Sequence, residues 1–265
     1  MGGDHSDEQK HFVLVHGLCH GAWSWFKLKP LLEAMGHRVS AFDLLASGIN
    51  TKVIQQVHTL SDYTMPLLEF MATLLPEEKV VLVGHSFGGM SISLAMEKFP
   101  HKISLAVFLS ATIPDYVHKP SYVLDKYIQS RSAEDWSDTQ ISPYGSENES
   151  ETSILFGPKF LASNLYQLCS KEDLELGKIL VRPSSFFLEN LHKEQPFSEK
   201  GYGSVTRVCA IAMEDKGIPK EFQRWMISNS PVSEVKELKD VDHMFMLSDP
   251  KQVCAYLADV ALRYA

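Results

Sequence analysis

The sequence contains few cysteines, no metal-ligand spacing and no long hydrophobic run. Its four cysteines are scattered without a C-x-x-C pair, which argues against a disulfide framework and predicts free thiols in a reducing compartment. Histidines and cysteines with the spacing of a zinc site are absent, so we expect neither a metal nor another cofactor. No segment approaches the roughly 18 consecutive apolar residues that a membrane-spanning helix needs.

Excess positive charge and a secretory leader are also missing. The net charge of −8 argues against nucleic acid as a partner. The loose myristoylation pattern at Met1–Ser6 has acidic neighbours, and a single acyl chain anchors only weakly. A glycosylation sequon at Asn148–Ser150 would matter only in a secreted protein. We therefore expect a cytoplasmic protein without stable membrane association. A neutral small molecule is compatible with the charge as its partner, and a homodimer stays open.

Apolar strand-like runs alternate with helical stretches along one chain that has no linker and no repeat. The strand candidates are residues 12–15, 38–43, 79–83, 103–109, 205–212 and 233–238. This alternation predicts an α/β fold with a mostly parallel six-stranded sheet and helices on both faces. Strand patterning lapses over residues 112–187, where aromatic residues are frequent and would be costly to expose. We expect this insertion to form a cap over a core made of residues 1–111 and 188–265.

The pentapeptide Gly84–Gly88 (GHSFG) joins the valine-rich run at 79–83 to a helical pattern over 90–99. Strand, sharp turn and helix together form the setting in which a serine is held on a strained turn with its hydroxyl exposed. The flanking glycines allow strand and helix to approach closely. Ser86 is therefore the candidate nucleophile. The alternative is a glycine-rich turn that contains an incidental serine.

A serine nucleophile needs a base and an acid, which follow it in the chain order Ser, then Asp or Glu, then His. His243, in the loop after the last strand candidate, is the expected base, because imidazole can accept a proton and return it near neutral pH. Glu214 and Asp215 follow the preceding strand candidate, and chemistry alone leaves either as the acid that orients the ring. Asp242 ranks below Asp215 because the side chains of adjacent residues, here Asp242 and His243, tend to diverge.

The negative charge that develops on a substrate carbonyl needs hydrogen-bond donors already in place. The N–H of Phe87, directly after the nucleophile, is one expected donor. The loop His16–Gly21 after the first strand is expected to supply the other from Leu18, while Gly17 lets the backbone pass close to the reacting carbonyl. In the cap, the candidate walls of an apolar substrate pocket are Tyr127, Trp136, Phe156 and Phe160.

Segments spread over nearly the whole chain carry a family resemblance. They are HFVLVHGLCHGAWSW, GHRVSAFDLLASGIN, EKVVLVGHSFGGMSISLAMEKFP, FGPKFLASNLYQLCS, LVRPSSFF, GSVTRV, EDKGIPKEFQRW and DHMFML. Together they resemble the plant methylesterase family of the α/β-hydrolase superfamily, which includes esterases of methyl salicylate, methyl jasmonate and polyneuridine aldehyde. The resemblance implies the α/β-hydrolase fold and a triad of Ser86, Asp215 and His243. It also implies Leu18 and Phe87 as backbone oxyanion donors.

Three functions follow from the resemblance and the triad. The first is a serine carboxylesterase that cleaves methyl esters of small apolar plant metabolites through an acyl-enzyme, with spontaneous decarboxylation if the freed acid carries a β-aldehyde. The second is a hydroxynitrile lyase; lyases of this family resemble one another in carrying threonine and lysine at the positions of Gly17 and Met244, which favours the esterase here. The third is a ligand-dependent receptor derived from a hydrolase. The resemblance also implies that Gly17 and Met244 lie beside the substrate.

Overall fold

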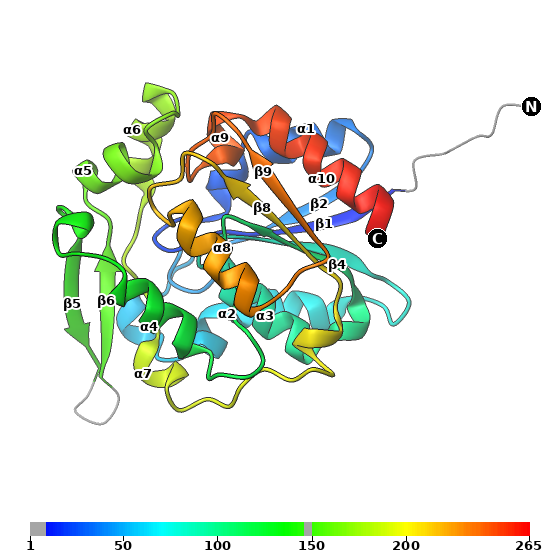
Figure 1. The fold of residues 1–265 in the computed structure, drawn as a ribbon, viewed down its shortest axis with the longest axis horizontal. Coiled ribbons are helices and arrows are strands. Elements are labelled where there is room, and N and C mark those ends of the chain that lie inside the picture. The colour runs from blue at the N-terminus through cyan, green and yellow to red at the C-terminus, as the bar shows by residue number, and fades with distance from the viewer. Residues whose placement is uncertain (1–8, 146–149) are drawn as a thin grey trace, which may run out of the picture.

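A computed structural model describes residues 9–145 and 150–265 of the chain. The sequence patterns at Met1–Ser6 and Asn148 lie outside the described residues. The central sheet has six strands in the order β2-β1-β3-β4-β8-β9, and every neighbouring pair is parallel (Figure 1). The strands are β1 His11–Val15, β2 Arg38–Ala41, β3 Val80–His85, β4 Ile103–Leu109, β8 Arg207–Ala212 and β9 Glu234–Leu238. The six-stranded parallel sheet predicted from the sequence is confirmed.

The inner strands are buried on both faces because their side chains are apolar at successive positions. In β1, Val13 and Val15 pack into one hydrophobic cluster, whereas Phe12 and Leu14 pack into the other. This alternation follows from the two-residue period of a strand. The sheet therefore divides the core into two layers, each of which is covered by helices.

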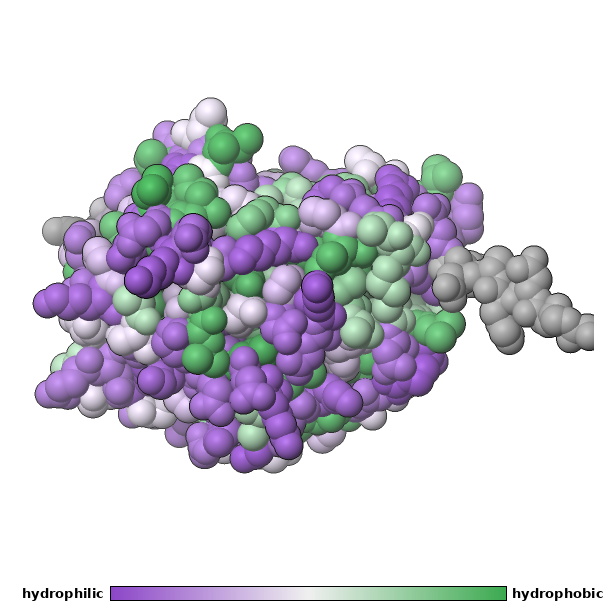
Figure 2. Space-filling model, turned by 90° about the horizontal axis from the view of Figure 1, so that it is seen from above, coloured by the Kyte–Doolittle hydropathy of each residue, from purple (hydrophilic) through white to green (hydrophobic). Residues whose placement is uncertain are grey.

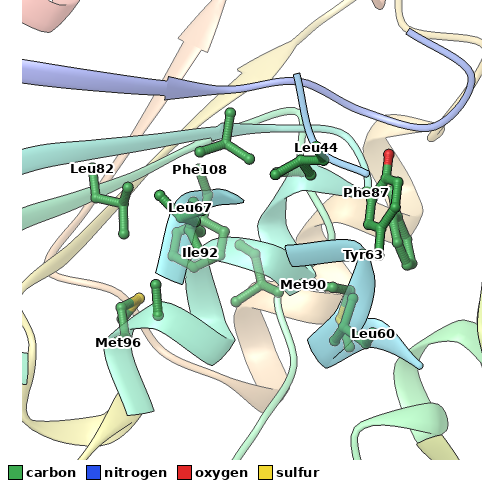
Figure 3. Close-up of a cluster of buried hydrophobic side chains, with 14 of the residues drawn as sticks. Leu44, Leu60, Tyr63, Leu67, Leu82, Phe87, Met90, Ile92, Met96 and Phe108 are labelled. Carbon is green, nitrogen blue, oxygen red and sulfur yellow. The ribbon is translucent and has the colours of Figure 1, made fainter. Parts of the chain in front are cut away.

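Helices cover both faces of the sheet (Figure 1). One layer holds α2 Leu60–Thr73, α3 Gly88–Lys98 and α8 Lys220–Asn229, and the other holds α1 Leu28–Ala34, α9 Phe245–Ser248 and α10 Pro250–Tyr264. Short helical turns are η1 Ala22–Trp25, η2 Ile54–Gln56, η3 Pro100–Lys102 and η6 Tyr202–Ser204. Figure 3 shows the layer between the sheet and helices α2 and α3, where Leu82 and Phe108 of the sheet face Leu67 and Ile92. These contacts hold the amino terminus of α3 at the carboxyl end of β3.

The β4–β8 connection, residues 110–206, contains its own small sheet, which the sequence analysis did not expect. Antiparallel strands β5 Gln140–Tyr144, β6 Glu151–Leu155 and β7 Ser184–Ser185 form it. The helices of the connection are α4 Ser121–Gln129, η4 Glu134–Trp136, α5 Pro158–Phe160, the π-helix η5 Leu161–Leu165, α6 Lys171–Leu180 and α7 Leu188–Leu191. The prediction that strand structure lapses over residues 112–187 was wrong. One reason is that β5 is a mostly exposed edge strand of sequence QISPY, in which no apolar alternation indicates a strand.

The face of the molecule in Figure 2 is mostly hydrophilic, with hydrophobic residues in small separate groups. Single exposed apolar side chains are ordinary on a folded surface. Every helix in the described parts of the chain is too short or too polar to cross a bilayer.

Candidate active site

Ser86 lies on the sharp turn between β3 and α3. Its backbone has a φ of +54°, the left-handed region that non-glycine residues seldom adopt. Its carbonyl oxygen accepts hydrogen bonds from the N–H groups of Gly89 and Thr112, both at 3.0 Å, which hold the turn in place. A Cβ atom at Gly88 would lie 2.6 Å from the carbonyl oxygens of Val15 and His16, so only glycine lets α3 start this close to β1. The turn thus holds a serine in a strained, well-fixed backbone conformation.

His243 and Asp215 form a hydrogen-bonded pair that is buried beside this turn. Nδ1 of His243 lies 2.8 Å from Oδ2 of Asp215, and the two side chains are 4% and 0% exposed. His243 and Ser86 line the same cavity. No hydrogen bond joins their side chains in the described part of the chain, and such catalytic bonds are often long in a free enzyme. The pairing leaves the Nε2 atom of His243 available to exchange a proton with Ser86.

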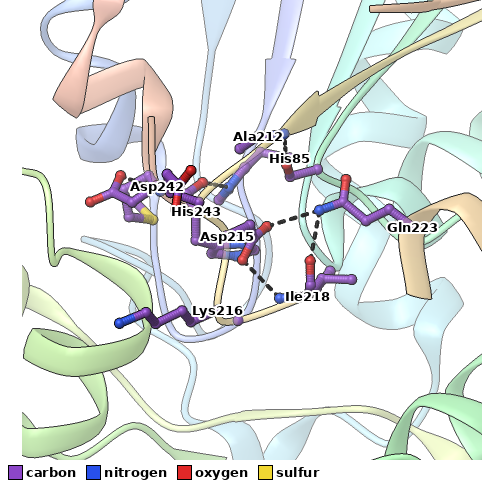
Figure 4. Close-up of polar contacts among 12 residues, drawn as sticks. His85, Ala212, Asp215, Lys216, Ile218, Gln223, Asp242 and His243 are labelled. Carbon is purple, nitrogen blue, oxygen red and sulfur yellow. Dashed lines mark hydrogen bonds and ion pairs between the residues drawn. The ribbon is translucent and has the colours of Figure 1, made fainter. Parts of the chain in front are cut away.

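Both carboxyl oxygens of Asp215 accept hydrogen bonds from residues that follow it in the chain. Oδ1 accepts from the N–H of Ile218 at 2.8 Å, and Oδ2 accepts from Nε2 of Gln223 at 3.2 Å (Figure 4). The same Nε2 group of Gln223 donates to the carbonyl of Ile218 at 2.7 Å. Gln223 is buried in α8, and the sequence analysis gave it no role. A buried amide eight residues after the acid carries no local pattern that could have revealed it.

The other two acids considered as partners of His243 have different surroundings. Asp242 accepts hydrogen bonds from the N–H groups of Leu168 at 2.7 Å and Met244 at 3.1 Å, so its carboxyl lies on the far side of the histidine backbone (Figure 4). Burial raises its pKa. Glu214 is exposed. Of the three acids considered from the sequence, only Asp215 contacts the imidazole.

His85, inside the turn motif, packs against His243. Its Nε2 donates to the backbone carbonyl of His243 at 2.8 Å, and the two ring centres are 4.6 Å apart. Burial lowers the pKa of His85 well below its ordinary value, so the ring is neutral. The neutral ring fixes the backbone of His243 without placing a second charge beside it.

The loop after β1 lies against Ser86. A Cβ at Gly17 would be 2.7 Å from Cβ of Ser86, so the loop backbone can pass this close only without a side chain. The expected oxyanion donors, the N–H groups of Leu18 and Phe87, have no acceptor among the described residues. Both residues line the cavity together with Ser86. Two unused donors beside a serine hydroxyl can stabilise an oxyanion.

Two histidines that the sequence analysis left without a role orient this loop. His16 accepts from the N–H of Leu44 at Nε2 (3.1 Å), so its Nδ1 donates to the carbonyl of Gly17 at 2.9 Å. His20 Nδ1 bonds the carbonyl of Leu18 at 2.7 Å, and burial lowers the pKa of His20 to about 3. Both rings are neutral and hold the loop carbonyls, which fixes the peptide planes that carry the N–H groups. Their position on either side of Gly17-Leu18 is the sequence signal that could have identified these histidines as supports of the loop.

The cavity beside Ser86 has mostly apolar walls, many of them aromatic. The four cap residues predicted as walls all line it: Tyr127, Trp136, Phe156 and Phe160. Walls that the sequence analysis did not name are Leu124, Leu165, Phe186, Ile218 and Phe222. Gly17 and Met244 are not among the lining residues; Gly17 packs against Ser86, and Met244 is buried in the hydrophobic core. A role for Met244 beside the substrate stays a prediction.

Comparison with known proteins agrees with the fold. The model of the alpha/beta hydrolase family matches residues 12–256. The chain is 58% identical to salicylic acid-binding protein 2 of Nicotiana tabacum over 97% of this chain and 99% of that protein. It is 53% identical to methylesterase 1 of Arabidopsis thaliana over 97% of each chain. The crystal structure of polyneuridine aldehyde esterase, 51% identical, superimposes with a TM-score of 0.93 over 96% of this chain and 100% of that one. The chain belongs to the α/β hydrolase family.

Proposed function

We propose that this protein is a serine carboxylesterase that cleaves methyl esters of small apolar plant metabolites. The observation that carries the proposal is a single apolar cavity lined by both Ser86 and His243, with Asp215 bonded to the far nitrogen of the imidazole. A serine on a strained turn, a base and an acid are the parts that acyl transfer requires. Two of the relatives are named as esterases, and the third is named for binding salicylic acid, a small aromatic acid.

Acylation begins when Oγ of Ser86 attacks the ester carbonyl carbon while Nε2 of His243 takes the hydroxyl proton. The carbonyl oxygen becomes an oxyanion, which accepts hydrogen bonds from the N–H groups of Leu18 and Phe87. Losing one such donor typically costs about 3–4 kcal/mol in the barrier. Collapse of the intermediate breaks the bond to the methoxy oxygen, which leaves as methanol with the proton from His243.

Deacylation repeats these steps with water as the nucleophile. His243 takes a proton from the water as its oxygen attacks the acyl carbon, and the same two N–H groups hold the second oxyanion. Cleavage of the ester bond to Ser86 returns the proton to its Oγ and frees the carboxylic acid. Asp215 stabilises the imidazolium in both halves of the reaction.

The acyl group of the substrate must fit the cavity beside Ser86, and most walls of this cavity come from the β4–β8 connection. We propose that residues 112–187 act as a cap, since five aromatic side chains from this segment line the cavity with Ser86. A phytohormone methyl ester or an indole-alkaloid methyl ester is the substrate class, the latter followed by spontaneous decarboxylation if the acid carries a β-aldehyde. We place the enzyme in the cytoplasm, where its four free cysteines would stay reduced.

The proposal is tested with a panel of methyl esters that includes methyl salicylate, methyl jasmonate and methyl benzoate, alongside mandelonitrile. The native enzyme should hydrolyse at least one ester, and Ser86→Ala should lower that rate by at least about a thousandfold. Hydrolysis that survives the substitution refutes the nucleophile assignment. Cyanide release faster than every ester hydrolysis would identify a lyase, and negligible turnover with ligand-dependent partner binding would identify a receptor. Trp136→Ala should change the ranking of the esters; an unchanged ranking refutes the role of the cap.

A further inference from the structure

A second cavity lies next to the catalytic one, inside the β4–β8 connection. Its volume is about 240 Å³. Its apolar walls come from α4, from β5 and β6 of the small sheet, and from the start of α7: Ile128, Ile141, Ile154, Phe187 and Leu188. Neither Ser86 nor His243 lines it, so it is separate from the reacting groups.

Two aromatic rings, Trp136 and Phe186, belong to the walls of both cavities. Their ring centres are 6.3 Å apart with planes at 75°. On the catalytic side, Phe186 meets the edge of Phe87 at 5.8 Å and Trp136 stacks on Phe160 at 6.3 Å. These two rings therefore stand between the two cavities, and an alkyl chain that passes them would lead from one cavity to the other.

The two buried polar side chains of the second cavity, Glu151 and Ser185, are hydrogen-bonded to backbone N–H groups of neighbouring residues. Glu151 accepts a hydrogen bond from the N–H of Asn190 at 2.8 Å, and Oγ of Ser185 accepts from the N–H of Phe187 at 2.9 Å. Glu189 is exposed. A polar ligand group would lose its hydration without gaining a partner from these residues, and a negatively charged group would meet two carboxyl side chains. The space accordingly suits an uncharged, apolar group.

We propose that the second cavity is a subsite for the distal apolar end of a long acyl group whose ester carbonyl lies at Ser86. This inference rests on the proposed esterase function and extends it from small acyl groups to longer alkyl or aryl-alkyl ones. A small acyl group occupies the catalytic cavity alone, whereas a longer one continues past Trp136 and Phe186. Each methylene group that the second cavity buries should raise kcat/KM about fourfold. This is the factor that corresponds to the free energy of transferring one methylene group out of water.

The experiment compares kcat/KM for straight-chain methyl esters from acetate to dodecanoate. We expect a rise with chain length that levels off when the cavity is full. Ile141→Trp should fill the cavity from its outer wall, where Ile141 is 54% exposed, and lower kcat/KM for methyl dodecanoate at least tenfold while methyl acetate is unchanged. Ile179→Trp is the matched control, because Ile179 is 76% exposed on α6 and lines neither cavity. Thr152→Trp, at an exposed position of β6 that also lines the cavity, replaces Ile141→Trp if that variant does not fold.

The outcomes separate this inference from the proposed function. A native enzyme that hydrolyses short esters but gains nothing from a longer chain overturns the subsite and leaves the esterase intact. Equal losses for short and long esters in Ile141→Trp, or no loss for either, also overturn it. If no ester is hydrolysed, the proposed function fails, and calorimetric titration of the Ser86→Ala protein with methyl dodecanoate still tests the subsite. The subsite is supported if adding Ile141→Trp to the Ser86→Ala protein weakens the binding of methyl dodecanoate at least tenfold. Binding that Ile141→Trp leaves unaltered, or binding that is undetectable in Ser86→Ala, overturns the subsite.

Discussion

Two buried aspartates beside His243 make opposite predictions when each is changed to asparagine. Asp215 contacts Nδ1 of the imidazole, whereas the neighbouring Asp242 contacts only backbone N–H groups and a thiol on the other side. In Asp215→Asn, the amide oxygen can keep the hydrogen bond from Ile218, which turns the NH₂ group toward His243. Nδ1 must then accept a hydrogen bond from this NH₂ group instead of donating one. The neutral ring would carry its proton on Nε2 and could not take the proton of Ser86.

The magnitude follows from this change of tautomer. The equivalent substitution in a serine protease leaves the geometry intact and lowers kcat about ten-thousandfold, which corresponds to about 5 kcal/mol in the barrier. We expect a loss of that order for Asp215→Asn. Asp242→Asn should keep kcat within about threefold, because the amide changes no contact of the imidazole.

The assay measures kcat at saturating concentration of the best methyl ester by quantifying the released acid. Circular dichroism and thermal unfolding establish that both variants are folded. Folded Asp215→Asn with kcat within tenfold of the native enzyme would refute the assignment of the acid. A hundredfold loss in folded Asp242→Asn would refute the conclusion that its carboxyl has no part in positioning the imidazole.

Three further predictions rest on single contacts. Gln223→Leu removes a buried hydrogen bond to a carboxylate, worth about 1.5–3 kcal/mol, and should lower kcat about ten- to a hundredfold with KM nearly unchanged; unchanged kcat would exclude a positioning role. Gly17→Ala places a Cβ atom 2.7 Å from Cβ of Ser86 and should lower kcat about a hundredfold; native kcat in this variant would contradict the close packing. Burial raises the pKa of Asp242, so its ionisation destabilises the fold as pH rises above its ordinary value of about 3.9. Urea unfolding should therefore show that the free energy of unfolding of Asp242→Asn, relative to that of the native protein, increases from pH 4 towards neutral pH. A difference that stays constant or falls over this range would refute the direction of the effect.

Local sequence was sufficient to predict the elements that a few neighbouring residues encode. The buried strands were recognisable from their continuous apolar runs, because a strand covered on both faces needs apolar side chains at successive positions. Ser86 was recognisable because the left-handed turn that exposes it depends on glycines two positions away on either side. The order of the acid and the base along the chain then restricted the search to two loops.

Only the tertiary structure decided what depends on contacts between distant segments. Glu214 and Asp215 are equivalent by chemistry and spacing, but folding buries Asp215 against His243 and leaves Glu214 exposed. The exposed edge strand β5 was missed because its pairing with β6 stabilises it, and its own side chains give no apolar alternation.

The same limit applies to the residues that support the site. Gln223 acquires its role from the direction in which α8 packs, and His16 acquires its tautomer from Leu44, 28 residues away. The second cavity is lined by residues from α4 to α7, which lie up to 61 positions apart in the chain. The sequence by itself thus determined the fold class and the candidate nucleophile, since short-range sterics and side-chain patterning specify both. The chemistry of the residues left the acid open and the family resemblance implied Asp215, but only the tertiary structure shows which acid contacts His243 and how much room an acyl group has, because hydrogen bonds and cavity walls form between residues that only folding brings together.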